Sequence, residues 1–315
     1  NNTAAIYVTH DLSLVAQIAD HILVLKDGKQ IEYGTTDQII NNPKEDYTKA
    51  LIDAAHVMPD EITSPALQIS KNPPLLEVKN VTAGYGKKQE ITAIKSANLS
   101  IEPGQTVGVI GESGSGKTTL GRVISGLMAP KQGQVFLNGQ VLQSNLSKRS
   151  REELRDIQFA FQMADVALNP RQKIGKILGR PMQFYRKISN KEMEYEVEKL
   201  LTRVDLPTEF IRRFPTELSG GQRQRVNLAR ALAAEPKLII CDEITSALDT
   251  IVAQQILDLL ASLQEELGLS YLFITHNIAT VAQISKKIAV MRNGQIIQSG
   301  FVEDVLTPPC HEYTQ

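Results

Sequence analysis

Several kinds of residue and segment are scarce in this chain of 315 residues, and each scarcity excludes a class of protein. Tryptophan is absent, and the only two cysteines, Cys241 and Cys310, are too few for a disulfide framework or a zinc site. No apolar run approaches the roughly 18 residues that span a bilayer, and no charged and then apolar leader opens the chain. With 34 basic and 35 acidic residues, the net charge of −1 disfavours bulk binding to nucleic acid or anionic membranes. We therefore expect a protein of a reducing compartment that reaches membranes only through partners.

A glycine-rich segment is the most specific feature that the chain does contain. Residues 111–118 fit the pattern G-x-x-x-x-G-K-[ST], between the apolar run 106–110 and the helical pattern 120–124 that this pattern requires. Glycines let backbone N–H groups face a phosphate, and the following helix start adds unpaired N–H groups. The residues predicted to bind a nucleoside triphosphate here are Gly111, Glu112, Ser113, Gly114, Ser115, Gly116, Lys117, Thr118 and Thr119.

Polar groups that complete such a site follow two other strand-like runs. Asp242 and Glu243 come directly after the apolar run 238–241, and His276 follows the run 271–275. An acidic pair alone would suggest a helix cap, but the phosphate loop favours a metal and base role. We expect Lys117 to reach the β- and γ-phosphates, Thr118 and Asp242 to hold Mg²⁺, and Glu243 to accept a proton from the attacking water or orient it. His276 is placed to contact the γ-phosphate and that water.

Further motifs follow in a fixed order along the chain. They are Tyr85 in Ala-Gly-Tyr-Gly, Gln162 in Phe-Gln, Leu-Ser-Gly-Gly-Gln at 218–222 and Asp249 in Ser-Ala-Leu-Asp. With the phosphate loop, they make the chain resemble the nucleotide-binding subunits of ABC transporters over nearly all its length. The resemblance implies an α/β P-loop NTPase fold with a mostly parallel core sheet, an antiparallel β-subdomain and an inserted α-helical signature subdomain at about 163–230.

The same resemblance assigns roles to these motifs. Tyr85 stacks on adenine, and Gln162 is a catalytic residue and a Mg²⁺ ligand. Asp249 lies at the interface of a dimer. The signature residues that are implied to contact the ATP of an opposite subunit are Ser219, Gly220, Gly221 and Gln222.

Three segments resemble the peptide and nickel importer group more narrowly. They are 168–171, 214–217 and the pair Tyr313-Thr314 after Pro309. Residues 163–167 and Ile244 depart from that group's pattern, the first near the surface that meets membrane subunits. The resemblance implies an ATPase that energises import of peptides or related small solutes, with ATP and Mg²⁺ as cofactors. Oligopeptides, dipeptides, glutathione-like molecules and nickel chelates all stay open as cargo.

The implied partners are a second nucleotide-binding domain, two transmembrane permease subunits and, indirectly, a periplasmic or extracellular substrate-binding protein. The implied location is peripheral, on the cytoplasmic face of the plasma membrane. No nucleic acid is expected as a partner. The alternative is a soluble tandem ABC ATPase that acts on the ribosome or nucleic acid, followed by an inactive paralogue. The alternative is disfavoured by the near-zero net charge and by the short spacing between phosphate loop and signature, which leaves no room for a long coiled coil.

An internal repeat concerns the organisation of the chain. Residues 7–34 align without gaps on residues 273–300 at an offset of 266, and the match extends to Tyr47-Thr48 against Tyr313-Thr314. A period of this size indicates tandem duplication of a whole domain. We expect a fragment of a fused two-domain protein, with these parts: 1–58, the tail of a first, truncated ABC ATPase domain; 59–74, a proline-containing linker; 75–300, a complete domain; and 301–315, the start of a C-terminal extension.

Local patterns predict three elements of the complete domain. Alternation at 75–81 indicates a half-exposed antiparallel strand. Segments 191–201 and 253–267 have the spacing of amphipathic helices, the second with Ile256, Leu257, Leu260 and Leu263 on one stripe.

Overall fold

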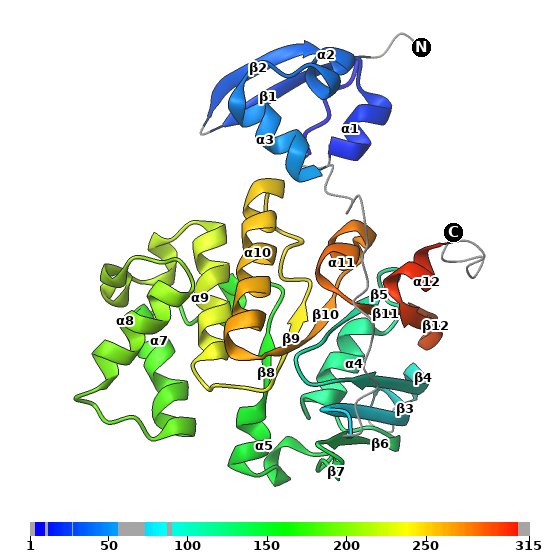
Figure 1. Ribbon diagram of the computed structural model, residues 1–315, viewed down its shortest axis with the longest axis vertical. Helices are drawn as coiled ribbons and strands as arrows, with labels where there is room; N and C mark the ends of the chain where they lie inside the picture. The colour runs from blue at the N-terminus through cyan, green and yellow to red at the C-terminus, as the bar shows by residue number, and fades with distance from the viewer. Residues whose placement is uncertain (1–3, 10–11, 27, 56–72, 87–89, 308–315) are drawn as a thin grey trace.

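The computed structural model describes residues 4–9, 12–26, 28–55, 73–86 and 90–307 (Figure 1). A small N-terminal unit occupies residues 4–55, and a larger unit occupies residues 73–307. Most of the predicted linker and the segment 308–315, which includes Cys310 and Tyr313, lie outside the described residues. No helix among the described residues is long and apolar enough to cross a membrane.

The larger unit is built on a six-stranded sheet in the order β12-β11-β5-β10-β9-β8. Five strands run parallel, and β12 pairs antiparallel to β11 at one edge. Strands β5, β9 and β10 are buried along their whole length, as their continuous apolar runs predict. The strands are β5 (Thr106–Ile110), β8 (Ile157–Ala160), β9 (Leu238–Asp242), β10 (Ser270–Ile274), β11 (Lys287–Arg292) and β12 (Gln295–Phe301).

A second, antiparallel sheet has the order β4-β3-β6-β7. Strand β3 confirms the half-exposed antiparallel strand predicted from position 75: Leu76, Val78 and Val81 are buried, Lys79 and Asn80 are exposed, and the strand pairs antiparallel with β4 and β6. Its Leu76 and Val78 share one core cluster with Val107 of β5 and Leu120 of the following helix. The strands are β3 (Leu76–Tyr85), β4 (Ile91–Ile101), β6 (Gln132–Leu137) and β7 (Gln140–Val141).

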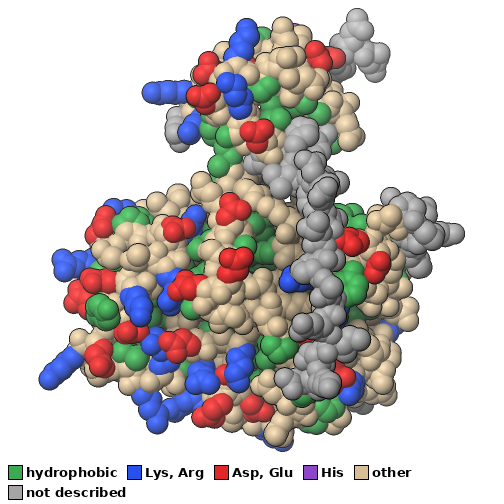
Figure 2. Space-filling view, viewed as in Figure 1, with side chains coloured by type: hydrophobic (Ala, Val, Ile, Leu, Met, Phe, Trp, Pro, Cys, Tyr) green, Lys and Arg blue, Asp and Glu red, His purple; other side chains and the backbone are tan. Residues whose placement is uncertain are grey.

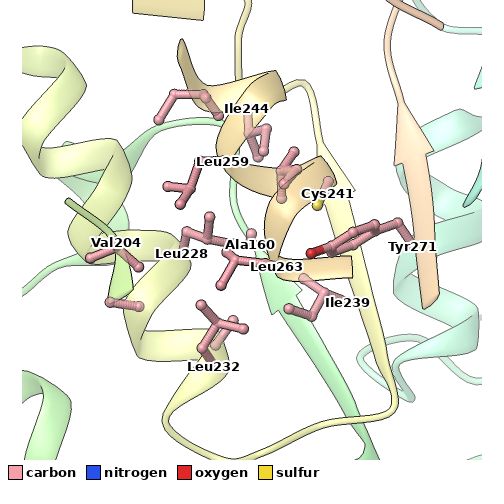
Figure 3. Packing of buried hydrophobic residues seen from close by; sticks show 14 of the residues in the cluster. Ala160, Val204, Leu228, Leu232, Ile239, Cys241, Ile244, Leu259, Leu263 and Tyr271 are labelled. Atoms are coloured by element: carbon pink, nitrogen blue, oxygen red, sulfur yellow. The ribbon is translucent and has the colours of Figure 1, made fainter. Parts of the chain in front are cut away.

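Helices cover the other face of the parallel sheet. Figure 3 shows Leu228 and Leu232 of α9 and Leu259 and Leu263 of α10 packed over β9, with Cys241 beneath them. The stripe predicted at 256–263 is buried, which confirms it as core. The helices are α4 (Lys117–Ile124), α5 (Arg151–Asp156), α6 (Ala164–Ala167), α7 (Ile174–Pro181), α8 (Met193–Arg203), α9 (Gly220–Leu232), α10 (Thr250–Leu267), α11 (Ile278–Ile284) and α12 (Val302–Leu306), with short helical turns η1 (Leu146–Lys148), η2 (Met182–Arg186), η3 (Thr208–Arg212) and η4 (Pro215–Glu217).

The N-terminal unit repeats the last part of the larger unit element by element. At the offset of 266, its α1, β1, β2 and α2 begin where α11, β11, β12 and α12 begin. The two hairpins have the same register, with a shift between Val24 and Leu25 in one and between Val290 and Met291 in the other. The elements of this unit are α1 (Leu12–Ile18), β1 (His21–Lys26), β2 (Lys29–Thr35), α2 (Thr36–Asn41) and α3 (Asp46–Ala55), and α3 contacts α10 of the larger unit.

Candidate nucleotide site

The predicted phosphate loop connects β5 to α4 at the carboxyl edge of the parallel sheet. Gly111 and Gly116 have φ angles of 148° and 107°. A Cβ on Gly111 would lie 2.1 Å from the Met291 carbonyl oxygen, and one on Gly116 would lie 2.6 Å from that of Ala93. Both positions therefore require glycine for space as well as for backbone conformation.

The Lys117 side chain is hydrogen-bonded to the backbone of the phosphate loop. Its Nζ donates hydrogen bonds to the carbonyl oxygens of Gly111 and Glu112, at 2.7 Å and 2.9 Å. Burial lowers the pKa of the Lys117 ammonium group, and the nearby carboxylates of Glu243 and Asp242 oppose that shift. The ammonium group is thus buried at the place where the motif predicts the phosphates.

The turn between β11 and β12 is hydrogen-bonded to the phosphate loop. The Gly294 N–H donates to the Ser115 carbonyl oxygen at 3.0 Å, and the Lys95 N–H of β4 donates to the Gly294 carbonyl oxygen at 2.7 Å. One turn therefore joins the phosphate loop to the second sheet. The sequence motif does not include this turn, which is almost 180 residues away along the chain.

Thr118 and Asp242 meet at the base of the loop. The Thr118 hydroxyl donates to Asp242 Oδ1 at 3.0 Å. Burial raises the pKa of the Asp242 carboxyl group, with Glu243 adding to the effect and the Thr118 hydrogen bond opposing it. A cation at this point would offset the cost of the buried charge.

These residues fit Mg²⁺. The described part of the chain has no cluster of three His, Cys, Asp or Glu residues that could hold a metal. Mg²⁺ needs no such cluster, because it takes most of its ligands from phosphates and water and one or two from protein oxygens. The paired hydroxyl and carboxylate oxygens match that requirement.

Glu243 lies at the centre of the three predicted catalytic residues. Gln162 donates from Nε2 to Glu243 Oε2 at 2.8 Å, and His276 Nδ1 lies 3.6 Å from Glu243 Oε1. Gln162 and Glu243, which are 81 positions apart in the sequence, are thus in direct contact. Glu243 has a φ of 48°, a left-handed conformation that costs an L-residue energy and is concentrated at functional sites.

Tyr85 lies beside the helix that follows the phosphate loop. Its hydroxyl is 2.9 Å from the hydroxyl of Thr119, and its side chain is exposed at the end of β3. The contact gives Thr119 a partner that the motif alone did not predict. Tyr85 is therefore near the phosphate end of the site with its ring accessible to a base.

The signature residues form the start of α9. The Ser219 hydroxyl accepts from the Gln222 N–H at 3.3 Å, while Gln222 Oε1 accepts from the Ser219 N–H at 3.0 Å, a reciprocal capping box. A Cβ on Gly221 would lie 2.4 Å from Val252 Cγ1, so close packing of α9 on α10 requires this glycine. Asp249 caps α10 by accepting from the Val252 N–H at 3.0 Å. Their contacts with an opposite subunit stay predictions.

Sequence reasoning missed a second set of polar residues on α9. Asn227, Arg223 and Arg230 contact the segment 161–168, which contains Gln162. The only signal in the sequence was a polar side chain every three or four residues along one helix.

Two family descriptions match this chain. Residues 94–246 match "ABC transporter", and residues 31–84 match "Oligopeptide/dipeptide transporter, C-terminal region". Proteins named "Glutathione import ATP-binding protein" from Escherichia coli (strain K12) and Shigella flexneri are each 37% identical over 339 residues, covering 98% of this chain and 54% of theirs. The chain therefore spans about half the length of the curated relatives it matches.

Solved structures resemble this chain over about three quarters of its length. The ATP-binding cassette MJ0796, described as a dimer in a post-hydrolysis state bound to ADP and Pi, is 33% identical with a TM-score of 0.64, over 72% of this chain and 98% of that one. The cbiO1 protein of Clostridium perfringens, part of the ABC transporter complex cbiONQ, is 26% identical with a TM-score of 0.65, over 74% of this chain and 90% of that one.

The ordered motifs, the assembled site and these likenesses agree, and the match at residues 31–84 favours a transporter over an ATPase of the ribosome. The chain belongs to the ABC transporter family of ATP-binding proteins, and its residues 31–84 are similar to the C-terminal region of oligopeptide and dipeptide transporters.

Proposed function

We propose that this chain binds and hydrolyses ATP to energise the import of peptides or related small solutes. The observation that carries the proposal is the position of Glu243 beside the phosphate loop, with Gln162 on one carboxylate oxygen and His276 near the other. The relatives named for glutathione import and the match to an oligopeptide and dipeptide transporter region support the direction and class of transport.

In the structure, the groups that we assign to ATP binding are hydrogen-bonded to other groups of the chain. Phosphate oxygens replace the carbonyl oxygens of Gly111 and Glu112 as partners of the Lys117 ammonium group, and the N–H groups at the start of α4 face the same phosphates. Thr118 and Asp242 would hold Mg²⁺, which would neutralise charge on the phosphates. Gln162 donates through its amide nitrogen to Glu243, so its amide oxygen remains for the same ion.

Hydrolysis requires a water molecule in line with the γ-phosphate. The Glu243 carboxylate accepts a proton from that water or orients it, and the Gln162 amide holds the carboxylate in place. His276 has an exposed ring beside Glu243, and we assign to it a contact with the γ-phosphate. The chain's own contribution to the reaction is therefore mainly positioning and charge.

A second nucleotide-binding domain completes the site. Ser219, Gly220, Gly221 and Gln222 offer the N–H groups of a helix start to an anion, and we assign that anion to ATP bound by the opposite domain. Asp249, which caps the neighbouring α10, lies at the same interface. The dimeric MJ0796 relative supports this arrangement.

We infer that residues 1–58 are the end of a first ATPase domain. Five apolar residues of the larger unit that are at most 1% exposed have counterparts at the offset of 266 that are 48–95% exposed. The exposed members are Ile6, Tyr7, Val8, Leu23 and Leu25; the buried members are Leu272, Phe273, Ile274, Ala289 and Met291. Figure 2 shows hydrophobic side chains on the surface of this upper unit. In the larger unit, β5 and its neighbours cover the equivalent surface, so a first domain would cover it here.

Exposed apolar side chains next to Gln162 support contact with permeases. Phe161, Met163 and Val166 have exposed fractions of 38%, 58% and 78%. We assign this surface to two transmembrane permease subunits, which place the chain on the cytoplasmic face of the membrane and connect it indirectly to a substrate-binding protein.

Affinity purification of the protein from gently solubilised membranes tests the proposal. We expect two multi-span membrane proteins to co-purify, and ATPase activity in the eluate that requires Glu243. Recovery of ribosomal proteins or nucleic acid without any multi-span protein would contradict the importer assignment.

A further inference from the structure

The helix that begins at the signature also holds the segment containing Gln162. The Asn227 side-chain amide donates from Nδ2 to the Phe161 carbonyl oxygen at 2.8 Å. This carbonyl belongs to the peptide bond that joins Phe161 to Gln162. Asn227 is fully buried, although most asparagines lie at the surface. Its amide therefore fixes the peptide from which Gln162 extends.

Arg230, one turn further along α9, holds the other end of the same segment. Its Nη1 donates to the Ala167 carbonyl oxygen, and its guanidinium lies over the Phe161 ring at 5.5 Å from the centroid. Its Nη2 donates to Asn227 Oδ1 at 3.1 Å, which orients the Asn227 amide so that Nδ2 faces Phe161. Arg223 adds an ion pair to Asp165 in the middle of the segment.

The charge of Arg230 has an unusual environment. No carboxylate lies within ion-pair distance of it in the described part of the chain. A largely buried guanidinium without a counter-ion is costly unless its N–H groups are satisfied. Both terminal nitrogens of this guanidinium donate a hydrogen bond, Nη1 to the Ala167 carbonyl oxygen and Nη2 to Asn227 Oδ1, so the charge of Arg230 is directed at this junction rather than at an ion pair.

We propose that Asn227 and Arg230 are positioning residues for ATP hydrolysis, which set the Gln162 amide against Glu243 by fixing segment 161–168 on the signature helix. The chain of contacts runs from α9 through the Phe161 peptide and the Gln162 amide to Glu243 Oε2. The inference rests on the proposed ATPase function.

The first test is the kinetics of Asn227→Ala and Asn227→Asp in the purified protein. The aspartate keeps the shape and can still accept from Arg230, but it cannot donate to the Phe161 carbonyl oxygen. We expect kcat for ATP hydrolysis to fall about three- to tenfold in both variants, the size of one lost net hydrogen bond. KM and the affinity for a fluorescent ATP analogue should change less than twofold, because the side chain of Asn227 bonds to Phe161 and Arg230 and not to the phosphate loop.

A second test asks whether the effect passes through Gln162. In a Gln162→Ala background, Asn227→Ala should lower kcat less than twofold further, since the amide that Asn227 positions is gone. A full three- to tenfold loss in that background would overturn the proposal. So would unchanged kcat in both Asn227 variants of an active parent.

Arg230→Lys and Arg225→Ala complete the design. Lysine keeps the positive charge but has one nitrogen where the guanidinium uses two, so we expect Arg230→Lys to lower kcat three- to tenfold as well. This variant keeps the proposal testable if an Asn227 variant folds poorly. Arg225 lies on the same helix but bonds to Val204 and Asp205, away from the site, so its loss should leave kcat unchanged. Equal kcat loss in Arg225→Ala would show a general effect on α9 and overturn the proposal. An inactive wild type would instead contradict the ATPase function itself.

Discussion

The N-terminal hairpin and the hairpin at the end of the larger unit have the same register and the same bulge, yet their surroundings differ. In the larger unit, β11 pairs with β5 on its second edge and Met291 is fully buried. In the N-terminal unit, β1 pairs only with β2 among the described strands, and the equivalent Leu25 is 57% exposed. Local sequence is thus enough to specify a hairpin, whereas burial depends on distant parts of a domain.

The largest difference between the two regions is chemical, because the larger unit contains the whole described set of Gln162, Glu243 and His276. Glu243→Gln should lower ATP hydrolysis at least about 100-fold, because the amide keeps the shape but cannot accept a proton. ATP binding should persist and trap a closed dimer, which size-exclusion chromatography with ATP would detect. Hydrolysis at the parent rate would show that Glu243 is not the catalytic carboxylate.

The matched positions Met291 and Leu25 test the difference in burial. Met291→Ala should destabilise the larger unit by about 2–4 kcal/mol, because it leaves a cavity in the core. Leu25→Ala should change stability by less than about 0.5 kcal/mol, because its side chain is exposed. Calorimetric unfolding measures both. Equal effects would mean that the surface of β1 is covered in solution.

The matched glycines Gly294 and Gly28 separate backbone strain from close packing. Both have positive φ, 81° and 73°, so alanine costs each about 1 kcal/mol in strain. A Cβ on Gly294 would lie 2.7 Å from the Ala93 carbonyl oxygen, whereas one on Gly28 would meet nothing within 4 Å. We expect Gly294→Ala to cost about 2 kcal/mol in total and to weaken ATP binding. An equal loss of stability in Gly294→Ala and Gly28→Ala would show that both positions need glycine for its backbone conformation alone, and not for space.

The smallest expected effect is a gain in stability from Asp242→Asn. Because burial raises the folded-state pKa of this carboxyl group, ionisation destabilises the folded protein as pH rises from the ordinary value towards the raised one. Above that window the variant should be about 1 kcal/mol more stable than the parent without nucleotide, and below it the difference should vanish. Denaturation at several pH values measures this. A variant that is less stable at neutral pH would show that the charge contributes to the fold.

The sequence predicted the parts of the site that lie at the ends of strands. Asp242, Glu243 and His276 follow buried apolar runs, and parallel strands place their carboxyl ends at one edge of the sheet. Composition and period could not predict the contacts of Asn227 and Arg230, because their partners lie more than 60 positions away and are backbone carbonyls. Gly221 was predicted for its place in the signature, but its packing against Val252 depends on the angle between two helices.

The turn at Gly294 links the two parts of the proposed nucleotide site. It is bonded both to Ser115 in the phosphate loop and to Lys95 in the sheet that contains β3, and Tyr85 at the end of β3 is bonded to Thr119. In the proposed site, base and phosphates would therefore bind to parts of the chain that are hydrogen-bonded to one another. We expect adenosine and inorganic pyrophosphate each to bind at one end of this site, whereas a nucleotide would reach both ends.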